Sequence, residues 1–288
     1  MKKNDNYITL TEMAEGFSEY NLPQTDKCRD FVAYIDDGNL VKFTFHDCTH
    51  LTYESLGDKF QDSEKVEYIA TEPAENVLYL SYTNKHGHML SWVLDLRKEI
   101  ATLVYSIFPS DEKSVDQNSP IPVISDELPI FKRVMNGQTA YTAKPVVHHC
   151  SLNKPYTKDT LKHEFTTELA GKNATYTYSE KDAYVHTYYD VDLFTWYCFS
   201  GNEAGLGETD YVKFLKIAED LYLILWVEKI LHVVSTIVLN FRTNRTSGSM
   251  ASYEGKDYKG KILNVPSGAL IELVDGINVT KLKPVKLK

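Results

Sequence analysis

The residues best placed to do chemistry are a glutamate and a histidine in aromatic-rich runs of the second half of the chain. Glu228 follows the run LYLILWV two positions after Trp226, and His186 lies in the run AYVHTYY. Residues spaced by two lie on the same face of a β-strand. If that face lines the interior of a barrel, burial raises the pKa of the Glu228 carboxyl, which can then act as a general acid or base. His186 could share a proton with it or orient a ligand.

Aromatic side chains have the spacing to surround these two residues. The same alternation gathers on one face Tyr176, Tyr178, Tyr188, Trp196 and Trp226. Such rings offer a stacking surface to a planar ligand. Two alternatives stay open. The rings could be ordinary core, with Glu228 emerging at the rim beside Lys229. Alternatively, the opposite face of the same strand, which is wholly apolar from Leu221 to Val227, could be the one that faces the interior.

Arginines follow two similar runs, and either could pair with the carboxylate of a ligand. Arg242 follows VLNF and Arg97 follows VLDL. Arginine contacts carboxylates through two parallel hydrogen bonds, so Arg242 is a candidate ligand-binding residue. The alternative is a surface arginine at the end of a strand. Glu254, in SYEG, is either a ligand at the rim or a turn residue.

Histidines raise the question of a metal. His46, Asp47 and His50 lie within five residues of one another, and His86 and His88 flank a glycine. Zinc sites need three or four convergent ligands, and these residues are expected in solvated turns. Neither a metal nor a cofactor is predicted. Nucleophile motifs such as GxSxG do not occur, and the glycines of GNEAGLGETD lack the following helix of a phosphate-binding loop. This segment is expected to be a lid or a plain turn at the barrel mouth.

Composition narrows the classes of protein. The 288 residues carry a formal net charge of −9, which argues against general nucleic-acid binding because that requires a basic surface. The N-terminal residues lack the apolar run of a signal peptide, and no run of about 18 apolar residues predicts a membrane-spanning helix. Four scattered cysteines without a CxxC pair predict reduced thiols. We therefore expect a cytoplasmic protein without membrane or nucleic-acid partners.

Short β-like runs follow one another along most of the chain. About eight lie between residues 31 and 107, with turn-forming residues every ten or so positions, and a second series begins near residue 173. A proline-rich stretch, residues 109–130, interrupts the pattern as a loop or linker. Regular short strands without long amphipathic helices predict an all-β barrel or sandwich.

The two series resemble each other. LTYES can be laid on FTWYC, VEYIA on VKFLK, LYLSY on LYLIL, and VLDLR on VLNFR, all in the same order. The third of these blocks matches Leu78 with Leu221. A repeat of this length predicts tandem duplicated domains.

The second series, with LAGKNATYTYS, AYVHTYYDVDLFTWYCFSGNEAGLGETDYVKFLKIAEDLYLILWVEK and SYEG, resembles the C-terminal domain of the MoaF family (molybdenum cofactor biosynthesis protein F-like). The first, with FTFHDCTHLTYES and LSWVLDL, resembles the N-terminal domain of that family. The resemblance implies two tandem calycin (lipocalin-like) antiparallel β-barrels and a link to aromatic small-molecule metabolism. It places the N-terminal barrel at residues 1–143, a connection at 144–163, and the C-terminal barrel at 164–288.

Two functions are expected for such barrels. The first is binding of a small aromatic or hydrophobic molecule inside the second barrel, whose strands are richer in aromatic residues. The second is a cofactor-free enzyme of the lyase, decarboxylase or isomerase type that acts on such a molecule by acid/base catalysis through Glu228 and His186. A filled, purely structural pair of barrels is a third alternative, and formation of a homodimer stays open.

Overall fold

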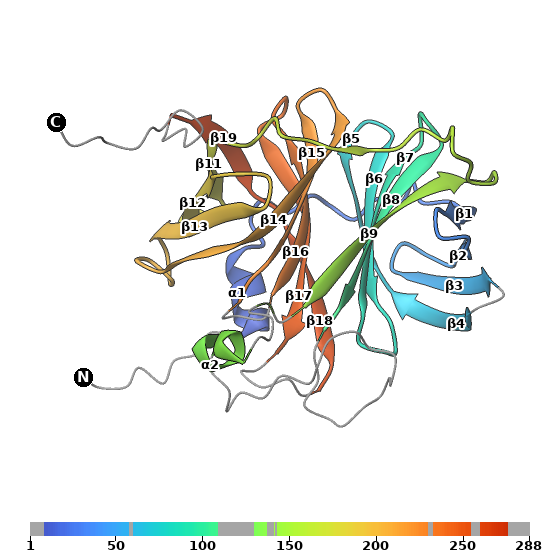
Figure 1. Cartoon of the computed structure of the whole chain (residues 1–288), viewed down its shortest axis with the longest axis horizontal. Helices are drawn as coiled ribbons and strands as arrows, with labels where there is room; N and C mark the ends of the chain where they lie inside the picture. Colours follow the sequence, from blue (N-terminus) through green and yellow to red (C-terminus); the bar gives the residue numbers. More distant parts are fainter. Residues whose placement is uncertain are drawn as a thin grey trace.

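The computed structural model describes residues 9–57, 60–108, 130–136, 141, 143–229, 233–254 and 260–275. Nearly all of this chain is antiparallel β-sheet, in two barrels that lie side by side (Figure 1). The expected fold class, all-β with two tandem antiparallel barrels, is confirmed. The proline-rich residues 109–129 lie outside the described part of the chain. Just after them comes the short helix α2 (Ile130–Met135).

The first barrel is a nine-stranded sheet in the order β4-β3-β2-β1-β9-β8-β7-β6-β5. Its strands are β1 (Phe31–Ile35), β2 (Leu40–Phe45), β3 (His50–Gly57), β4 (Phe60–Glu67), β5 (Ile69–Ala74), β6 (Val77–Thr83), β7 (Met89–Asp95), β8 (Ile100–Ile107) and β9 (Lys144–Leu152). The outermost strands of this order, β4 and β5, are consecutive in the chain and meet at Tyr68. The barrel is therefore nearly closed.

Strand β9 lies in the range that was expected to connect the barrels. It pairs with β8 and with β1, so residues 144–152 complete the first barrel. Its sequence, KPVVHHCSL, did not predict a strand, because a proline and two adjacent histidines are typical of a loop. The structure therefore moves the end of the first barrel from residue 143 to residue 152.

The second barrel contains β10 (Glu164–Phe165), β11 (Asn173–Thr177), β12 (Ala183–Tyr188), β13 (Leu193–Ser200), β14 (Gly207–Ala218), β15 (Leu221–Val227), β16 (Val234–Asn240), β17 (Arg245–Tyr253), β18 (Ile262–Ser267) and β19 (Leu270–Val274). The long strand β14 pairs with β13 on one side and with β15 on the other, which closes the ring. Strand β18 adds to β17 outside this ring.

Each barrel has its own core, and a third apolar cluster joins the two barrels. Leu221, Leu223 and Leu225 of β15 pack in this cluster against Val77 and Tyr79 of β6. Burial of such side chains on both sides of the junction stabilises the tandem arrangement by about 1.5–3 kcal/mol for each large side chain.

Buried hydroxyl groups add specificity to the junction. The Tyr79 hydroxyl lies 2.7 Å from Thr236 Oγ1 and 2.7 Å from Ser249 Oγ, which both belong to the second barrel. Thr71 Oγ1 lies 2.7 Å from Ser247 Oγ in the same way. Because an unmade buried hydrogen bond costs free energy, these contacts favour one relative placement of the barrels.

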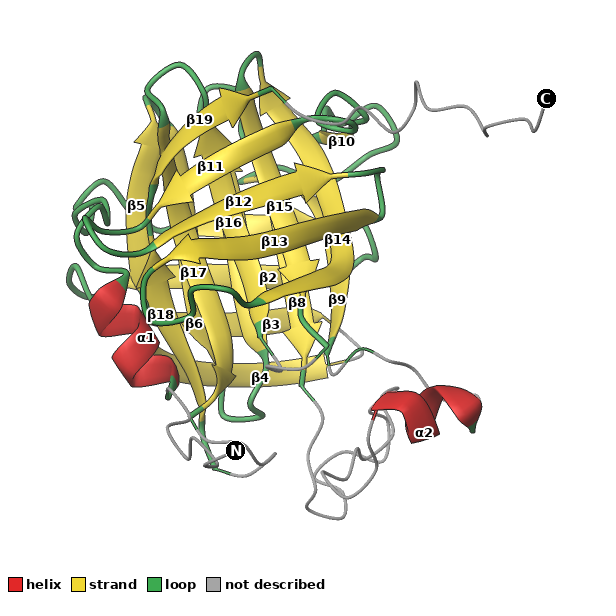
Figure 2. Cartoon of the chain, turned by 90° about the vertical axis from the view of Figure 1, so that its left-hand side faces the viewer, coloured by secondary structure: helices red, strands yellow, loops and turns green. Residues whose placement is uncertain are grey.

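The helix α1 (Leu10–Gly16) precedes the first barrel in the chain but lies on the second, against β18 (Figure 2). Thr9 caps it, since the Thr9 hydroxyl accepts a hydrogen bond from the backbone N–H of Glu12 and the Glu12 carboxylate accepts one from the backbone N–H of Thr9. The N-terminal part of the chain thus covers one end of the C-terminal barrel. In the described residues no helix is long and apolar enough to cross a membrane.

Candidate functional site

The aromatic face of β15 points into the second barrel. Tyr222 and Trp226 belong to the core of this barrel, whereas Leu221, Leu223 and Leu225 face the first barrel. This settles which face is interior: the apolar alternative packs between the barrels. Both faces of β15 are buried, and for this reason every residue of the strand is apolar or aromatic.

A small cavity lies at the end of the barrel that α1 covers. Its volume is about 30 Å³, and it is lined by Met13, Phe17, Tyr178, Tyr184, His186, Trp196, Glu203, Trp226, Glu228 and Met250. Such a space holds about one water molecule. Five of the expected site residues, Tyr178, His186, Trp196, Trp226 and Glu228, are therefore brought together.

Glu228 follows the last residue of β15, and its carboxyl group turns into this cavity. It is 8% exposed, and its Oε1 accepts a hydrogen bond of 3.0 Å from the indole N–H of Trp226. Burial, together with the nearby charge of Asp210, holds the pKa of Glu228 well above its usual range. The raised pKa favours the protonated carboxyl, which can donate a hydrogen bond.

His186 on β12 is 3% exposed and is surrounded by rings. Its imidazole stacks on Tyr176 with 4.0 Å between centroids and meets Trp226 edge to face at 5.6 Å. Its Nδ1 has no hydrogen-bonding partner among the described residues. Burial lowers the pKa of His186 to about 3, so the ring is neutral at physiological pH. A neutral imidazole with a free nitrogen can exchange a hydrogen bond with a ligand.

Asp210 on β14 is a second buried acid behind the aromatic wall. It is fully buried, and its Oδ2 accepts a hydrogen bond of 3.1 Å from the indole N–H of Trp196. Lys229 Nζ lies 3.6 Å from its Oδ1. Burial raises the pKa of Asp210 to about 6, and Lys229 opposes that effect only in part.

Tyr176 and Tyr188 lie in the same core but do not line the cavity. Their hydroxyl oxygens are 2.5 Å apart, so the two phenols satisfy each other. Tyr176 supports His186 by stacking, and Tyr188 meets the same ring at 6.2 Å. Both residues contact the His186 ring without lining the cavity.

Arg242 lies away from the cavity. It lines a separate open groove of about 700 Å³ at the junction of the barrels, together with residues that include Lys27, Glu72 and Arg97. Arg97, its counterpart in the first barrel, forms two hydrogen bonds of 2.9 Å with Asp95. In the second barrel Asn240 takes the place of that aspartate and accepts from the backbone N–H of Arg242.

Several residues of the cavity were missed from the sequence. Tyr184 shares the alternation of His186 and could have been included, and its hydroxyl donates to Glu203 Oε2 at 2.7 Å. Glu203 belongs to the GNEAGLGETD segment, which begins as a turn and continues from Gly207 as the start of β14. Gly201 begins this turn with φ of 116°, and a Cβ there would lie 2.1 Å from Asp182 Oδ1, so only glycine fits. For Met13 and Phe17 no sequence signal existed.

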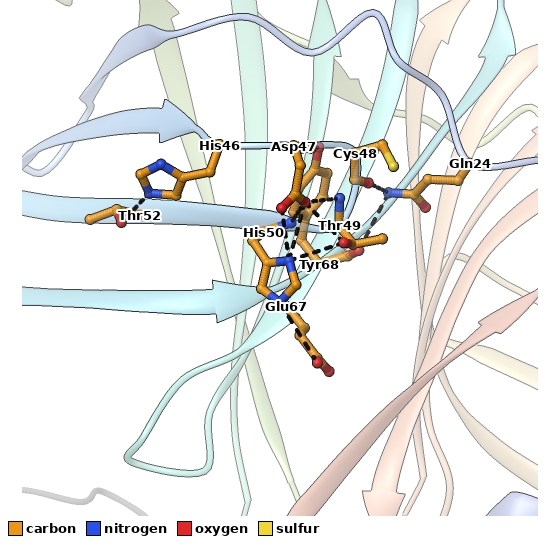
Figure 3. A network of polar contacts seen from close by, with 9 residues as sticks. All are labelled: Gln24, His46, Asp47, Cys48, Thr49, His50, Thr52, Glu67 and Tyr68. Carbon is orange, nitrogen blue, oxygen red and sulfur yellow. Dashed lines mark hydrogen bonds and ion pairs between the residues drawn. The ribbon is translucent and has the colours of Figure 1, made fainter.

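The histidine cluster of the first barrel has a structural role (Figure 3). Asp47 Oδ1 accepts hydrogen bonds from the backbone N–H groups of Thr49 and His50, at 2.7 and 2.6 Å, and lies 3.1 Å from His50 Nδ1. His46 Nε2 instead lies 2.8 Å from Thr52 Oγ1. Within the described ranges no group of three or more histidine, cysteine, aspartate or glutamate residues could hold a metal ion. The cluster stabilises the turn between β2 and β3.

The first barrel lacks the two ionisable groups of the site. Phe43 pairs with Tyr53 in the first barrel as His186 pairs with Trp196 in the second, so Phe43 occupies the place of the histidine. Tyr82 is the interior aromatic near the end of β6, and two residues later Asn84 stands where Glu228 follows Trp226. The acid and the imidazole are thus specific to the second barrel.

Comparison with known proteins agrees with this duplicated architecture. Residues 5–110 match the MoaF N-terminal domain, and residues 163–277 match the MoaF C-terminal domain. The chain is 26% identical over 281 residues to Protein MoaF of Klebsiella aerogenes, covering 96% of this chain and 97% of that protein. A solved structure from Burkholderia vietnamiensis, whose name refers to a β-lactamase, aligns with 37% of this chain and with 96% of that protein's chain. The sequence identity is 13% and the TM-score is 0.31, which is too low to show a shared fold. With both of its domains matched in order, the chain belongs to the MoaF family.

Proposed function

We propose that the second barrel binds a small aromatic or hydrophobic molecule at the cavity beneath α1. One observation carries the proposal: a buried, neutral histidine with an unpartnered nitrogen faces an aromatic-lined space. Leaving such a group unsatisfied costs about 1–3 kcal/mol in a purely structural core. A ligand that exchanges a hydrogen bond with His186 would recover this cost, and the rings around it would stack on the ligand. The first barrel has Phe43 in this position and therefore lacks the imidazole.

Binding is tested by calorimetry and thermal shift with uncharged aromatic compounds, compared between matched variants of the two barrels. Trp196→Phe changes the wall of the cavity and removes the hydrogen bond to Asp210. Tyr53→Phe is the matching change in the first barrel. We expect Trp196→Phe to weaken binding and Tyr53→Phe to leave it unchanged. If no aromatic compound shifts the melting temperature, and native mass spectrometry of protein taken from cells shows no retained ligand, the proposal is wrong.

A second candidate function, acid/base catalysis, rests on the protonation states in the cavity. Burial raises the pKa of Glu228, which favours its protonated form, and lowers the pKa of His186 to about 3, so a carboxyl and a neutral imidazole face the same space. A bound molecule with an exchangeable C–H bond would then take up deuterium from heavy water. We expect Glu228→Gln to abolish this exchange and Glu272→Gln, at an exposed position of β19, to leave it intact.

Exchange that continues at the same rate in Glu228→Gln would remove the glutamate from the mechanism. If no exchange occurs in any variant while binding persists, the barrel only binds. The reaction would need no cofactor, because proton transfer is complete with these two side chains. The four cysteines have free thiols, as is usual in the reducing cytoplasm, and we propose the cytoplasm as the location of the protein.

A further inference from the structure

The N-terminal segment puts an aromatic ring into the mouth of the second barrel. Phe17, which follows α1, is 6% exposed and stacks on Tyr178 with 4.2 Å between ring centroids and 15° between planes. The edge of Tyr184 meets the same ring at 5.7 Å and 84°. Parallel stacking on one tyrosine and edge contact with another is the arrangement expected for a bound aromatic ligand.

The remaining cavity is too small for such a ligand while Phe17 is in place. A dry cavity that accepts benzene has a volume of about 150 Å³, whereas the cavity beneath α1 measures about 30 Å³. The side chains that offer hydrogen bonds, His186 and Glu228, line this small space together with Phe17 and Met13. Withdrawal of the phenyl ring would therefore open a ring-sized space that is continuous with both polar groups.

Phe17 and Met13 pack into the core of the second barrel, whereas the hydrogen bonds of Thr11 and Glu19 with this barrel lie outside the cavity. The backbone N–H and the hydroxyl of Thr11 donate to Glu254 Oε2, at 3.2 and 3.0 Å. Farther along, Glu19 Oε2 accepts from the backbone N–H of Glu180 at 2.8 Å. Beyond this point the chain packs closely on the second barrel, since a Cβ at Gly268 would lie 2.9 Å from Asn21 Cα. Local opening of residues 9–19 would leave both barrels intact.

The charges around the cavity select against one class of ligand. Glu228 and Glu203 line it, and Asp210 lies behind Trp196. Lys229, a cation of this region, is already shared between Asp210 at 3.6 Å and Glu208 at 3.9 Å. Burying an anion near Asp210, whose pKa of about 6 leaves it ionised at neutral pH, would add repulsion to the cost of desolvation.

We propose that the Phe17 ring occupies the ring subsite of the ligand, that the ligand is a single aromatic ring without negative charge, and that the N-terminal segment must leave to admit it. This inference rests on the proposed binding function of the second barrel. The ring replaces Phe17 between Tyr178 and Tyr184, and its polar substituent reaches His186 and Glu228.

The test compares the full-length protein with Phe17→Ala, using p-cresol and p-toluate as probes that share a p-methylphenyl ring but differ in charge. We expect Phe17→Ala to bind p-cresol roughly ten-fold more tightly than the unaltered protein, because a competing stacked ring is gone. Binding of p-toluate is expected to stay undetectable. Phe165→Ala, which removes an exposed phenylalanine of β10, is the control and should leave the affinity for p-cresol unchanged.

A second variant guards against loss of folding in Phe17→Ala. Glu254→Ala removes the anchor of Thr11 without changing the lining of the cavity, and should speed the association of p-cresol. Equal affinity and equal association rates in all variants would overturn the inference and leave the binding function standing. Failure of p-cresol to bind any variant would overturn both, and tighter binding of p-toluate would overturn the charge selection.

Discussion

The buried acid Asp210 should make the second barrel less stable as the pH rises. Its pKa is 3.8 ordinarily and about 6 in the folded protein, and the side chain is fully buried. Ionising it after folding therefore costs about 3 kcal/mol more than in the unfolded chain, at about 1.36 kcal/mol per pKa unit. Because the pKa is raised in the folded state, this contribution to the unfolding free energy is complete below pH 3.8. The protein loses it as the pH rises through about 6.

Asp210→Asn removes the titration and keeps the main contact. The amide oxygen of asparagine can still accept the hydrogen bond from the indole N–H of Trp196. Relative to the natural protein, we expect the variant to gain up to about 3 kcal/mol in unfolding free energy between pH 4 and pH 7, with most of the change below pH 6.5. The measured difference in unfolding free energy also contains a contribution from the neighbouring Glu228, because Asp210 helps to raise the pKa of Glu228.

Urea unfolding at pH 4, 5, 6 and 7, followed by tryptophan fluorescence, gives the difference directly. The pH dependence of carboxylates that do not interact with Asp210 cancels because both proteins contain them. Glu272→Gln, an exposed carboxylate of β19, is the control and should give parallel curves. If Asp210→Asn and the natural protein also differ by a constant amount at every pH, Asp210 ionises without penalty and the electrostatic description of the site is wrong.

Two further changes test the cavity and the junction of the barrels. His186→Phe, which installs the residue found at the matching place in the first barrel, should raise the unfolding free energy by about 1–3 kcal/mol because it removes an unsatisfied buried nitrogen. The same variant should lose binding of aromatic compounds, and a fall in stability would mean that His186 is already satisfied. Tyr79→Phe should lower the unfolding free energy by about 0.5–1.5 kcal/mol, since it removes a hydrogen bond to Thr236 and to Ser249, which keep other partners. An unchanged urea midpoint for Tyr79→Phe would show that the hydroxyl network does not stabilise the junction.

The alternation of aromatic residues was enough to predict the second barrel and the composition of its interior. It could not decide which face of β15 is interior, because both faces of LYLILWV are apolar. That choice depends on the first barrel, which covers the leucine face. The repeat between LYLSY and LYLIL was also matched one residue out of step. Leu78 lies in the core of the first barrel, so its counterpart is Tyr222, in the core of the second, and not Leu221. A shift of one residue moves a strand's side chains to the other face.

The closing element of the site could not be predicted because it comes from the far end of the chain. The whole first barrel lies between Phe17 and its partner Tyr178 in the sequence. Nothing in a short helical segment indicates which barrel that segment covers. Arg242 shows the opposite case. Its place after a strand of the second barrel suggested a ligand contact, but the turn between β16 and β17 opens toward the junction groove.

A crystal structure of the full-length protein grown with p-cresol tests the central claim most directly. We predict the ring of the probe between Tyr178 and Tyr184, its hydroxyl within hydrogen-bonding distance of His186 or Glu228, and Phe17 displaced from its present position. A probe bound in the first barrel or in the groove beside Arg242, or no bound probe with Phe17 unmoved, would contradict the assignment of the site.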